Sequence, residues 1–471
     1  MSKKFQNKGR RKFIKQASCA ALGYTTIFST LNSLKAANAA AIMNSSTLLG
    51  GDYKALVCLM FSGGNDSFNM LIPRGNAEYN EYMTTRSNQS IPQNDILPIT
   101  PNTSDGKQYG LHPALGGVQQ MFQNGNAAFL SNVGTLVEPM TRQQYEQGTA
   151  AVPLGLYSHS DQVMHWQTAV PQDRASIGWG GKMADLMQSA NDNTNIAMNI
   201  SMSGNNVFQV GQNTVEYSLN PYDGSYGLLG YNDPWASSML RKGAIDNMLD
   251  KHYTDIFKHA YVDVVRNAKS AHEEFSTALE GLSPFDTQFT DSDLSQSFHM
   301  VAKTIAMRET LGMKRQIFFI DYGGWDHHDE VLDNQMFMFG EVNNAIVEFQ
   351  AAMQEMGLTD CVTTFTASEF GRTLTSNGNG TDHGWGGNSL VVGGAVNGKD
   401  IYGNFPSLEL DAELEIGGGV LIPTLSCDEY FSELAMWYGV TPSELPIILP
   451  NIGNFYSPGG GNPPPIGFMN I

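Results

Sequence analysis

The sequence predicts an α/β fold in which a mainly parallel central sheet is flanked by helices. The continuous apolar run at residues 55–61, and the stretch at 315–320 with its four consecutive apolar residues, are typical of strands buried on both faces. Glycine-rich turns follow these runs, and residues 337–356 place apolar side chains at helical spacing. Strand, turn and helix in repeated succession are typical of an α/β fold.

The expected elements follow one another along the chain. Apolar character and length predict strands at residues 55–61, 127–130, 315–320, 361–367 and 390–392. Amphipathic spacing predicts helices at residues 114–122, 337–356 and 429–437. Residues 190–300 differ in composition, with charged helical segments between 246 and 282, and we expect them to form an inserted cap subdomain. Residues 457–471 are rich in Gly and Pro and are predicted to form an irregular tail.

The first 39 residues have the three parts of a twin-arginine signal peptide. Arg10 and Arg11 precede an apolar stretch at 17–31, and small residues at 37–39 supply a cleavage site. The apolar stretch is shorter than the roughly 20 residues that span a bilayer, so a retained anchor is the weaker alternative. We therefore expect export by the twin-arginine translocase to the periplasm or the extracellular space, with an α/β domain at residues 40–456.

Composition excludes some classes of partner. The formal net charge is −19, and the signal peptide takes basic residues with it, so the mature chain is more acidic still. Such a surface repels nucleic acid and anionic lipid, and no second apolar span follows the signal. Three cysteines, Cys58, Cys361 and Cys427, remain in the mature chain, and the first two lie in or beside apolar runs typical of small buried residues. A disulfide scaffold is therefore not indicated.

Polar residues directly after the predicted strands are the candidate functional residues, because ligands bind beyond the carboxyl ends of parallel strands. The candidate metal ligands are Asp66, Asp326, His327, His328, Glu369 and His383. Carboxylates and imidazoles that meet at one place bind divalent cations such as zinc, manganese, magnesium or calcium. Singly, each carboxylate also suits a turn, and Asp326 or Asp329 could instead cap the next helix.

A short segment supplies candidate catalytic residues. Ser158, His159 and Ser160 precede a stretch of helical character, and the dipole of a helix favours an anion or an alkoxide at its N-terminus. A serine there is therefore a candidate nucleophile. The alternative is a capping box in which Ser158 and Asp161 only cap the helix.

Several motifs spread over nearly all of the mature chain are typical of one family. They include FSGGNDSFNMLIP at 61–73, YSHSDQ at 157–162, GGWDHH at 323–328 and TASEFGRTLTSNGNGTDHGWGG at 366–387. Through them the chain resembles the exported bacterial family catalogued as domain of unknown function 1501, which is itself similar to the alkaline phosphatase and sulfatase superfamily. The resemblance implies an alkaline phosphatase-like core with a metal pair at the carboxyl ends of the central strands.

The resemblance also implies roles for individual residues. On the superfamily template Asp66 resembles the first-strand metal carboxylate, Asp326 with His328 the ligands of the second metal, and His383 the late histidine ligand. Ser158 or Ser160 falls in the region of the nucleophile. Two departures from the superfamily template leave the number and identity of the metals open. Glu330 stands at the spacing of the usual histidine, and Ser368 with Glu369 replaces an Asp-His pair. One metal, a different metal or none are the alternatives.

Two hypotheses of function follow. The first is an exported, metal-dependent hydrolase of phosphate or sulfate esters that acts on a small-molecule or polymer substrate. In that enzyme Arg372 or Lys182 neutralises the leaving oxyanion. The second is a catalytically degenerate secreted protein that keeps the fold and serves in binding or assembly.

Overall fold

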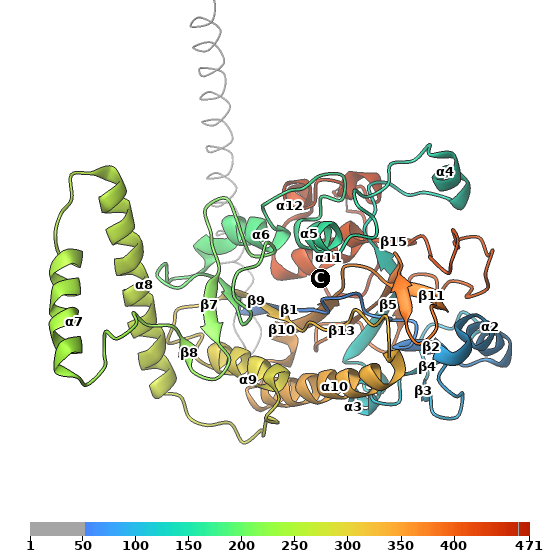
Figure 1. Cartoon of the computed structure of the whole chain (residues 1–471), viewed down its shortest axis with the longest axis horizontal. Helices are drawn as coiled ribbons and strands as arrows, with labels where there is room; N and C mark the ends of the chain where they lie inside the picture. The colour runs from blue at the N-terminus through green and yellow to red at the C-terminus, as the bar shows by residue number, and fades with distance from the viewer. Residues whose placement is uncertain (1–51, 460) are drawn as a thin grey trace, which may run out of the picture.

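A large, mainly parallel sheet lies at the centre of the molecule (Figure 1). The computed structural model describes residues 52–459 and 461–471, so the predicted signal peptide at 1–39 lies outside the described residues. The strands of this sheet, in spatial order, are β14 (Ile401–Tyr402), β5 (Ala127–Gly134), β13 (Gly387–Val392), β10 (Val362–Ala367), β1 (Lys54–Met60), β9 (Arg315–Asp321), β6 (Asn199–Ser201), β7 (Tyr217–Asn220) and β8 (Gly224–Ser225), with β15 (Leu425–Ser426) paired to β5.

The parallel strands form the middle of this sheet. β1 pairs in parallel with β10 on one side and with β9 on the other, and β9 pairs in parallel with β6. β13 runs antiparallel between β10 and β5. The predicted α/β class with a mainly parallel sheet is confirmed.

The residues of β1 show why an uninterrupted apolar run suits this position. Side chains alternate between the two faces of a strand. Val57 and Leu59 therefore join the hydrophobic core on one face, and Cys58 and Met60 join the core on the other. Both faces are covered, so every position of the strand from Ala55 to Met60 is apolar.

Helices cover both faces of the sheet (Figure 1). One face carries α3 (Gly116–Gln123), α9 (Asp293–Ala306) and α10 (Val331–Glu355). The opposite face carries α5 (His159–Thr168), α6 (Trp179–Met187), α11 (Cys427–Tyr438) and α12 (Leu445–Ile448). A capping box between Ser426 and Glu429 begins α11, and Trp179 of α6 stacks on Phe431 of α11 with ring centroids 4.4 Å apart.

Residues 190–300, expected to form an inserted cap, divide into two parts. β6, β7 and β8 extend the central sheet at one edge. α7 (Ala236–Leu249) and α8 (Ile256–Glu280) form a helical hairpin that projects beyond this edge (Figure 1). Part of the expected cap thus belongs to the sheet itself, and the hairpin is its separate portion.

Two smaller sheets complete the fold near the candidate site. β2 (Leu71–Pro73), β4 (Tyr109–Leu111) and β3 (Leu97–Ile99) form one, beside α2 (Asn76–Arg86). β11 (Arg372–Ser376) and β12 (Thr381–His383) form the other, an antiparallel pair that follows β10 in the chain. This hairpin presents two of the predicted site residues, Arg372 and His383.

The C-terminal tail is irregular, as the sequence predicts, and it is firmly packed. Phe468 is fully buried in the core on the α11 face. The buried carboxylate of Glu433 accepts backbone hydrogen bonds from four successive residues, 466–469. These contacts stabilise an irregular segment that has no ladder of its own.

The described residues also show the state of the cysteines and the character of the helices. Cys58, Cys361 and Cys427 are buried free thiols. Among helices in the part of the chain that is described, none has both the length and the apolar character needed to cross a bilayer.

Candidate metal centre

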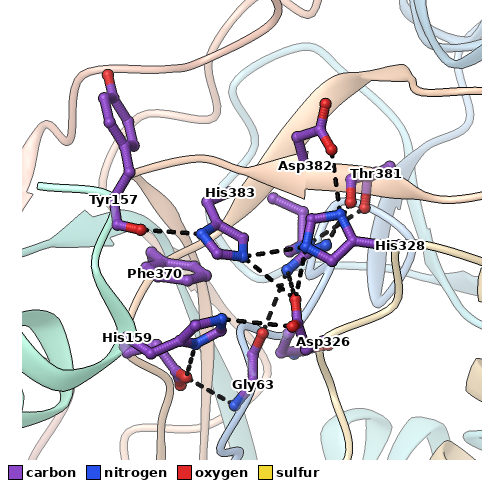
Figure 2. A network of polar contacts seen from close by, with 12 residues as sticks. Gly63, Tyr157, His159, Asp326, His328, Phe370, Thr381, Asp382 and His383 are labelled. Carbon is purple, nitrogen blue, oxygen red and sulfur yellow. Dashed lines mark hydrogen bonds and ion pairs between the residues drawn. The ribbon is translucent and has the colours of Figure 1, made fainter.

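Four side chains from three segments meet beyond the carboxyl end of the central strands (Figure 2). Asp326 and His328 lie in the loop after β9, His159 is the first residue of α5, and His383 is the last residue of β12. His159, Asp326 and His383 each offer one ligand atom, and these atoms lie within 4.8 Å of one another. The topology thus gathers at one place residues that are far apart in the sequence.

Asp326 lies at the centre of this cluster. Its Oδ1 atom is 3.0 Å from Nε2 of His328 and 3.2 Å from Nε2 of His383. Its Oδ2 atom is 3.4 Å from Nε2 of His159. Desolvation raises the pKa of Asp326, but the Arg372 guanidinium and the neighbouring imidazoles outweigh it and lower that pKa below its usual value. Asp326 is therefore a carboxylate at neutral pH.

His159 is held from behind by Glu369. Nδ1 of His159 lies 2.9 Å from Oε1 of Glu369, which also accepts the backbone N–H of Gly63 at 2.7 Å. The Glu369 side chain is 1% exposed, and its Oε2 atom has no hydrogen-bond partner among the described residues. A carboxylate in this place keeps the imidazole proton on Nδ1 and leaves Nε2 free to bind a cation.

The other two imidazoles are held in the same way. Nδ1 of His328 lies 3.1 Å from Oδ1 of Asp382, and Nδ1 of His383 lies 2.9 Å from the backbone carbonyl of Tyr157 (Figure 2). Both partners only accept, so each ring donates through Nδ1 and turns the lone pair of Nε2 inward. All three imidazoles therefore present Nε2 toward Asp326.

The donor set indicates which cations fit. Three imidazole nitrogens and one carboxylate suit zinc or another first-row transition ion. Magnesium and calcium prefer ligand sets made of oxygen, so they fit less well than the sequence alone suggested. The buried, unpaired oxygen of Glu369 adds negative charge behind the ligands, which favours a bound cation.

Arg372, expected to meet a leaving oxyanion, has another place in the structure. Its buried guanidinium donates to Oδ1 of Asp326 at 2.6 Å, to the Gly63 carbonyl at 3.2 Å and to the Thr381 carbonyl. These bonds hold the Asp326 carboxylate in position. Lys182, the alternative, donates to the backbone carbonyl of Ile448 at 3.0 Å.

Asp66 and His327, two further predicted ligands, lie outside the cluster. Asp66 is fully buried and forms an ion pair with the equally buried Arg86, the last residue of α2. His327 is buried beside Trp325, with ring centroids 5.9 Å apart. Desolvation lowers the pKa of His327 and the charge of Asp66 opposes that shift. A guanidinium therefore neutralises the carboxylate that the resemblance assigns to a metal.

The two capping alternatives are wrong. α5 begins at His159 with Ser158 as its N-cap, yet the Ser158 side chain makes no capping hydrogen bond. Its Oγ atom lies 3.1 Å from Oγ of Ser160. α10 has Glu330 as its N-cap, in the left-handed conformation, so neither Asp326 nor Asp329 caps it.

Two contributors escape sequence reasoning. Tyr157 acts through its backbone carbonyl, which carries no residue identity, so no pattern could have indicated it. Arg86 lies 20 positions from Asp66 at the end of an unremarkable helix. Only the fold brings that guanidinium to the carboxylate.

Comparison with known families identifies a family that matches most of the chain. The family model described as "Protein of unknown function (DUF1501)" matches residues 53–416. The chain belongs to the DUF1501 family. The membership expected from the motifs is confirmed. No curated protein matches this DUF1501 chain.

Solved structures similar to the DUF1501 chain include sulfatases and an alkaline phosphatase. A sulfatase from Pseudoalteromonas sp. shares 10% identity, with 87% of this chain and 72% of that chain covered and a TM-score of 0.34. Ps i-CgsB in complex with k-i-k-neocarrahexaose shares 11% identity, with 85% and 76% covered and a TM-score of 0.32. A mutant of the alkaline phosphatase PafA shares 10% identity, with 68% and 63% covered and a TM-score of 0.27. The strand order and the contacts described above define the fold and the site.

Proposed function

We propose that this DUF1501 protein is an exported, metal-dependent hydrolase of phosphate or sulfate esters. His159, Asp326, His328 and His383 would hold the metal. The observation that supports this most is the orientation of the three imidazoles, which direct Nε2 toward Asp326 while an acceptor occupies each Nδ1. Three imidazoles that direct the same nitrogen toward one carboxylate form a donor set ready for a cation.

The remaining polar groups around the cluster position the ligands. Glu369, Asp382 and the Tyr157 carbonyl orient the three rings and increase the basicity of Nε2. Arg372 orients Asp326. When bound, a metal ion supplies Lewis-acid polarisation of an ester oxygen.

Ser158 and Ser160 are the proposed nucleophiles. They flank the ligand His159 at the N-terminus of the ten-residue helix α5, where the helix dipole stabilises an alkoxide. Ser160 is exposed and Ser158 half-buried, so substrate can reach both hydroxyl groups. No capping bond engages Ser158, and its Oγ atom lies 3.1 Å from Oγ of Ser160, so the two hydroxyl groups lie side by side at the start of α5.

The contacts support one metal rather than a pair. Asp66 is neutralised by Arg86, and Glu369 supports His159 from behind instead of facing Asp326. The site is also open, since 42% of the Asp326 side chain is exposed. An open site is compatible with an ester carried on a polymer as well as with a small molecule.

Metal analysis of the purified chain tests this proposal. We expect about one transition-metal ion per chain, as in a mononuclear site. His383→Ala and Asp326→Ala should lose the metal, whereas His259→Ala, a change at an exposed histidine on α8, should keep it. p-Nitrophenyl phosphate and p-nitrophenyl sulfate, with and without added zinc or manganese, then report hydrolysis.

The outcomes separate the two hypotheses. Metal bound by the native chain, lost in both variants and needed for hydrolysis, supports the enzyme. Metal bound without hydrolysis of either ester removes the hydrolase and leaves a metal site. A chain that neither binds metal nor hydrolyses ester supports the secreted binding or assembly protein.

A further inference from the structure

The α7–α8 hairpin and the loop before it expose many large apolar side chains. Phe257 is 83% exposed and Tyr261 is 71% exposed, one turn apart on α8. The other exposed apolar side chains of this surface are Leu229, Trp235, Met239, Leu240, Met248, Ile256 and Val264. We call the part of this surface around Met248, Phe257, Tyr261 and Val264 the hairpin patch; Met239, nine residues before Met248, lies on the opposite side of α7. Soluble proteins rarely leave so much apolar surface uncovered.

A groove runs through the hairpin patch between the two helices. Its volume is about 650 Å³, and it is lined mainly by apolar side chains. Met248 and Leu249 contribute from α7, and Phe257, Tyr261 and Val262 contribute from α8. The patch therefore contains both protruding aromatic rings and a hollow of a size that can receive such rings.

The hairpin stands apart from the rest of the molecule. α7 packs on α8, and α8 reaches the central sheet through β8. In Figure 1 both helices lie beyond the sheet edge, far from α5 and the candidate metal centre. A partner can therefore bind the hairpin without contact with the body of the protein or with the site.

The area of the hairpin patch matches a stable interface. Trp, Phe and Tyr side chains each bury about 150–250 Å² when covered. Phe257, Tyr261 and Val264 lie on one side of α8, at positions i, i+4 and i+7. With Met248 and the other groove residues they approach the roughly 800 Å² per partner of a standard interface. A small ligand would leave most of this surface exposed.

We propose that a second copy of this chain covers the hairpin patch, so that two hairpins pack as a four-helix bundle. A two-fold interface requires a self-complementary surface, and this patch supplies both the protruding Phe257 ring and a groove for its counterpart. Helical hairpins that face each other along apolar stripes pack in this way.

The charges of the hairpin differ from those of the whole chain. The whole chain carries a net charge of −19, which repels an anionic bilayer and a second copy alike. Within residues 236–270, basic side chains are interspersed with acidic ones: Arg241, Lys242, Asp246, Asp250, Lys251, Asp255, Lys258, Asp263, Arg266 and Lys269. These six basic and four acidic side chains give residues 236–270 a net charge of +2. Two copies can therefore meet there with less repulsion than between their acidic bodies, which the projection of the hairpin keeps apart.

Sedimentation equilibrium of the purified chain tests the proposal. We expect twice the mass of one chain at micromolar concentration. Phe257→Asp and Tyr261→Asp should each raise the dimer Kd by at least about thirtyfold, as at an interface hot spot. Phe337→Asp, at a 68% exposed position on α10, is the matched control and should leave the Kd unchanged. Thermal melting of each variant checks that it is folded. Because these side chains are exposed, we expect the substitutions to leave the Tm of the monomer unchanged.

Three results would overturn the proposal. The first is a monomer at all concentrations up to about 100 μM. The second is a dimer whose Kd does not change in Phe257→Asp and Tyr261→Asp. The third is a Phe337→Asp control that raises the Kd as much as those two variants do. Co-sedimentation with phosphatidylglycerol or phosphatidylcholine vesicles is run in parallel. A monomer that binds vesicles through the hairpin patch would assign the surface to lipid instead.

Discussion

The Nε2 atoms of His328 and His383 lie 3.1 Å apart. Each ring donates through Nδ1 to a fixed acceptor, so in the neutral form both Nε2 atoms carry lone pairs that face each other and the Asp326 carboxylate. Three electron-rich atoms at this distance repel unless a cation or a proton lies between them. This relationship is the strongest physical reason to expect a metal at the site.

The contact between Glu369 and His159 gives the first prediction. Glu369→Gln keeps the shape of the side chain and removes its charge, so the Nδ1–H group of His159 meets a weaker, neutral amide acceptor in place of a carboxylate. We expect metal affinity to fall by about 10- to 100-fold. Competition with a chromogenic chelator measures the Kd. Glu409→Gln, at an exposed position, is the control, and equal affinity in both variants would contradict the role of Glu369.

The two serines give a prediction about chemistry apart from metal binding. In Ser158→Ala/Ser160→Ala the metal ligands remain, so the metal content should match that of the native chain. Loss of the nucleophile should lower kcat for ester hydrolysis by at least about 10³-fold. Hydrolysis that survives the double substitution would mean that water or another group attacks the ester. Ser407→Ala, at an exposed position, controls for nonspecific effects.

The buried pair of Asp66 and Arg86 gives a prediction about stability. Arg86→Met leaves the fully buried Asp66 carboxylate without its counter-charge, and we expect the free energy of unfolding to fall by about 3–5 kcal/mol. Urea unfolding measures it. Arg142→Met, which breaks a partly exposed pair with Glu146, should cost less than about 1 kcal/mol. Adding Asp66→Asn to Arg86→Met should recover part of the loss.

Asp428 gives a prediction about pH. Burial raises its pKa to about 8, so between its unfolded pKa and pH 8 the folded chain binds one more proton at this site than the unfolded chain. This contribution is fully present below the unfolded pKa and is lost as the pH rises toward 8. Through Asp428, the free energy of unfolding changes by at most about 1.4 kcal/mol per pH unit.

Asp428→Asn should remove this dependence. Urea unfolding at a series of pH values from about 5 to 8 is the measurement, and the difference in stability between native chain and variant should grow with pH. Asp291→Asn, at an exposed position, should show the same pH profile as the native chain. A parallel profile for Asp428→Asn would mean that Asp428 is ionised when folded.

The packed tail gives a prediction that its composition would not suggest. Phe468→Ala empties a fully buried position on the α11 face, and we expect a loss of about 3–5 kcal/mol in the free energy of unfolding. Ile471→Ala, at a mostly exposed position three residues later, should change it by less than about 0.5 kcal/mol. Equal stability of the two variants would mean that the tail does not contribute to the core.

Local patterns were sufficient for much of the fold. The predicted strand at 55–61 differs from β1 by one residue at each end, and the predicted strand at 315–320 differs from β9 only at its last residue, because a strand buried on both faces leaves a largely apolar signature. The expected strand at 127–130 is longer in the structure, since β5 continues to Gly134 through Ser131 and Asn132. Those polar residues are buried and hydrogen-bonded within the fold, which no local pattern reveals.

By itself the sequence determined the α/β class, the family, and the residue types gathered at the ends of the strands, because these follow from periodicity and from motifs read along the chain. Only the tertiary structure decided their partners. His159 and Glu369 stand 210 residues apart, yet their contact makes one a candidate ligand and the other its support. Asp66 has the same residue type as Asp326, but Arg86 neutralises it in the core. A carboxylate's role depends on the charges and acceptors around it, and folding brings these from distant segments.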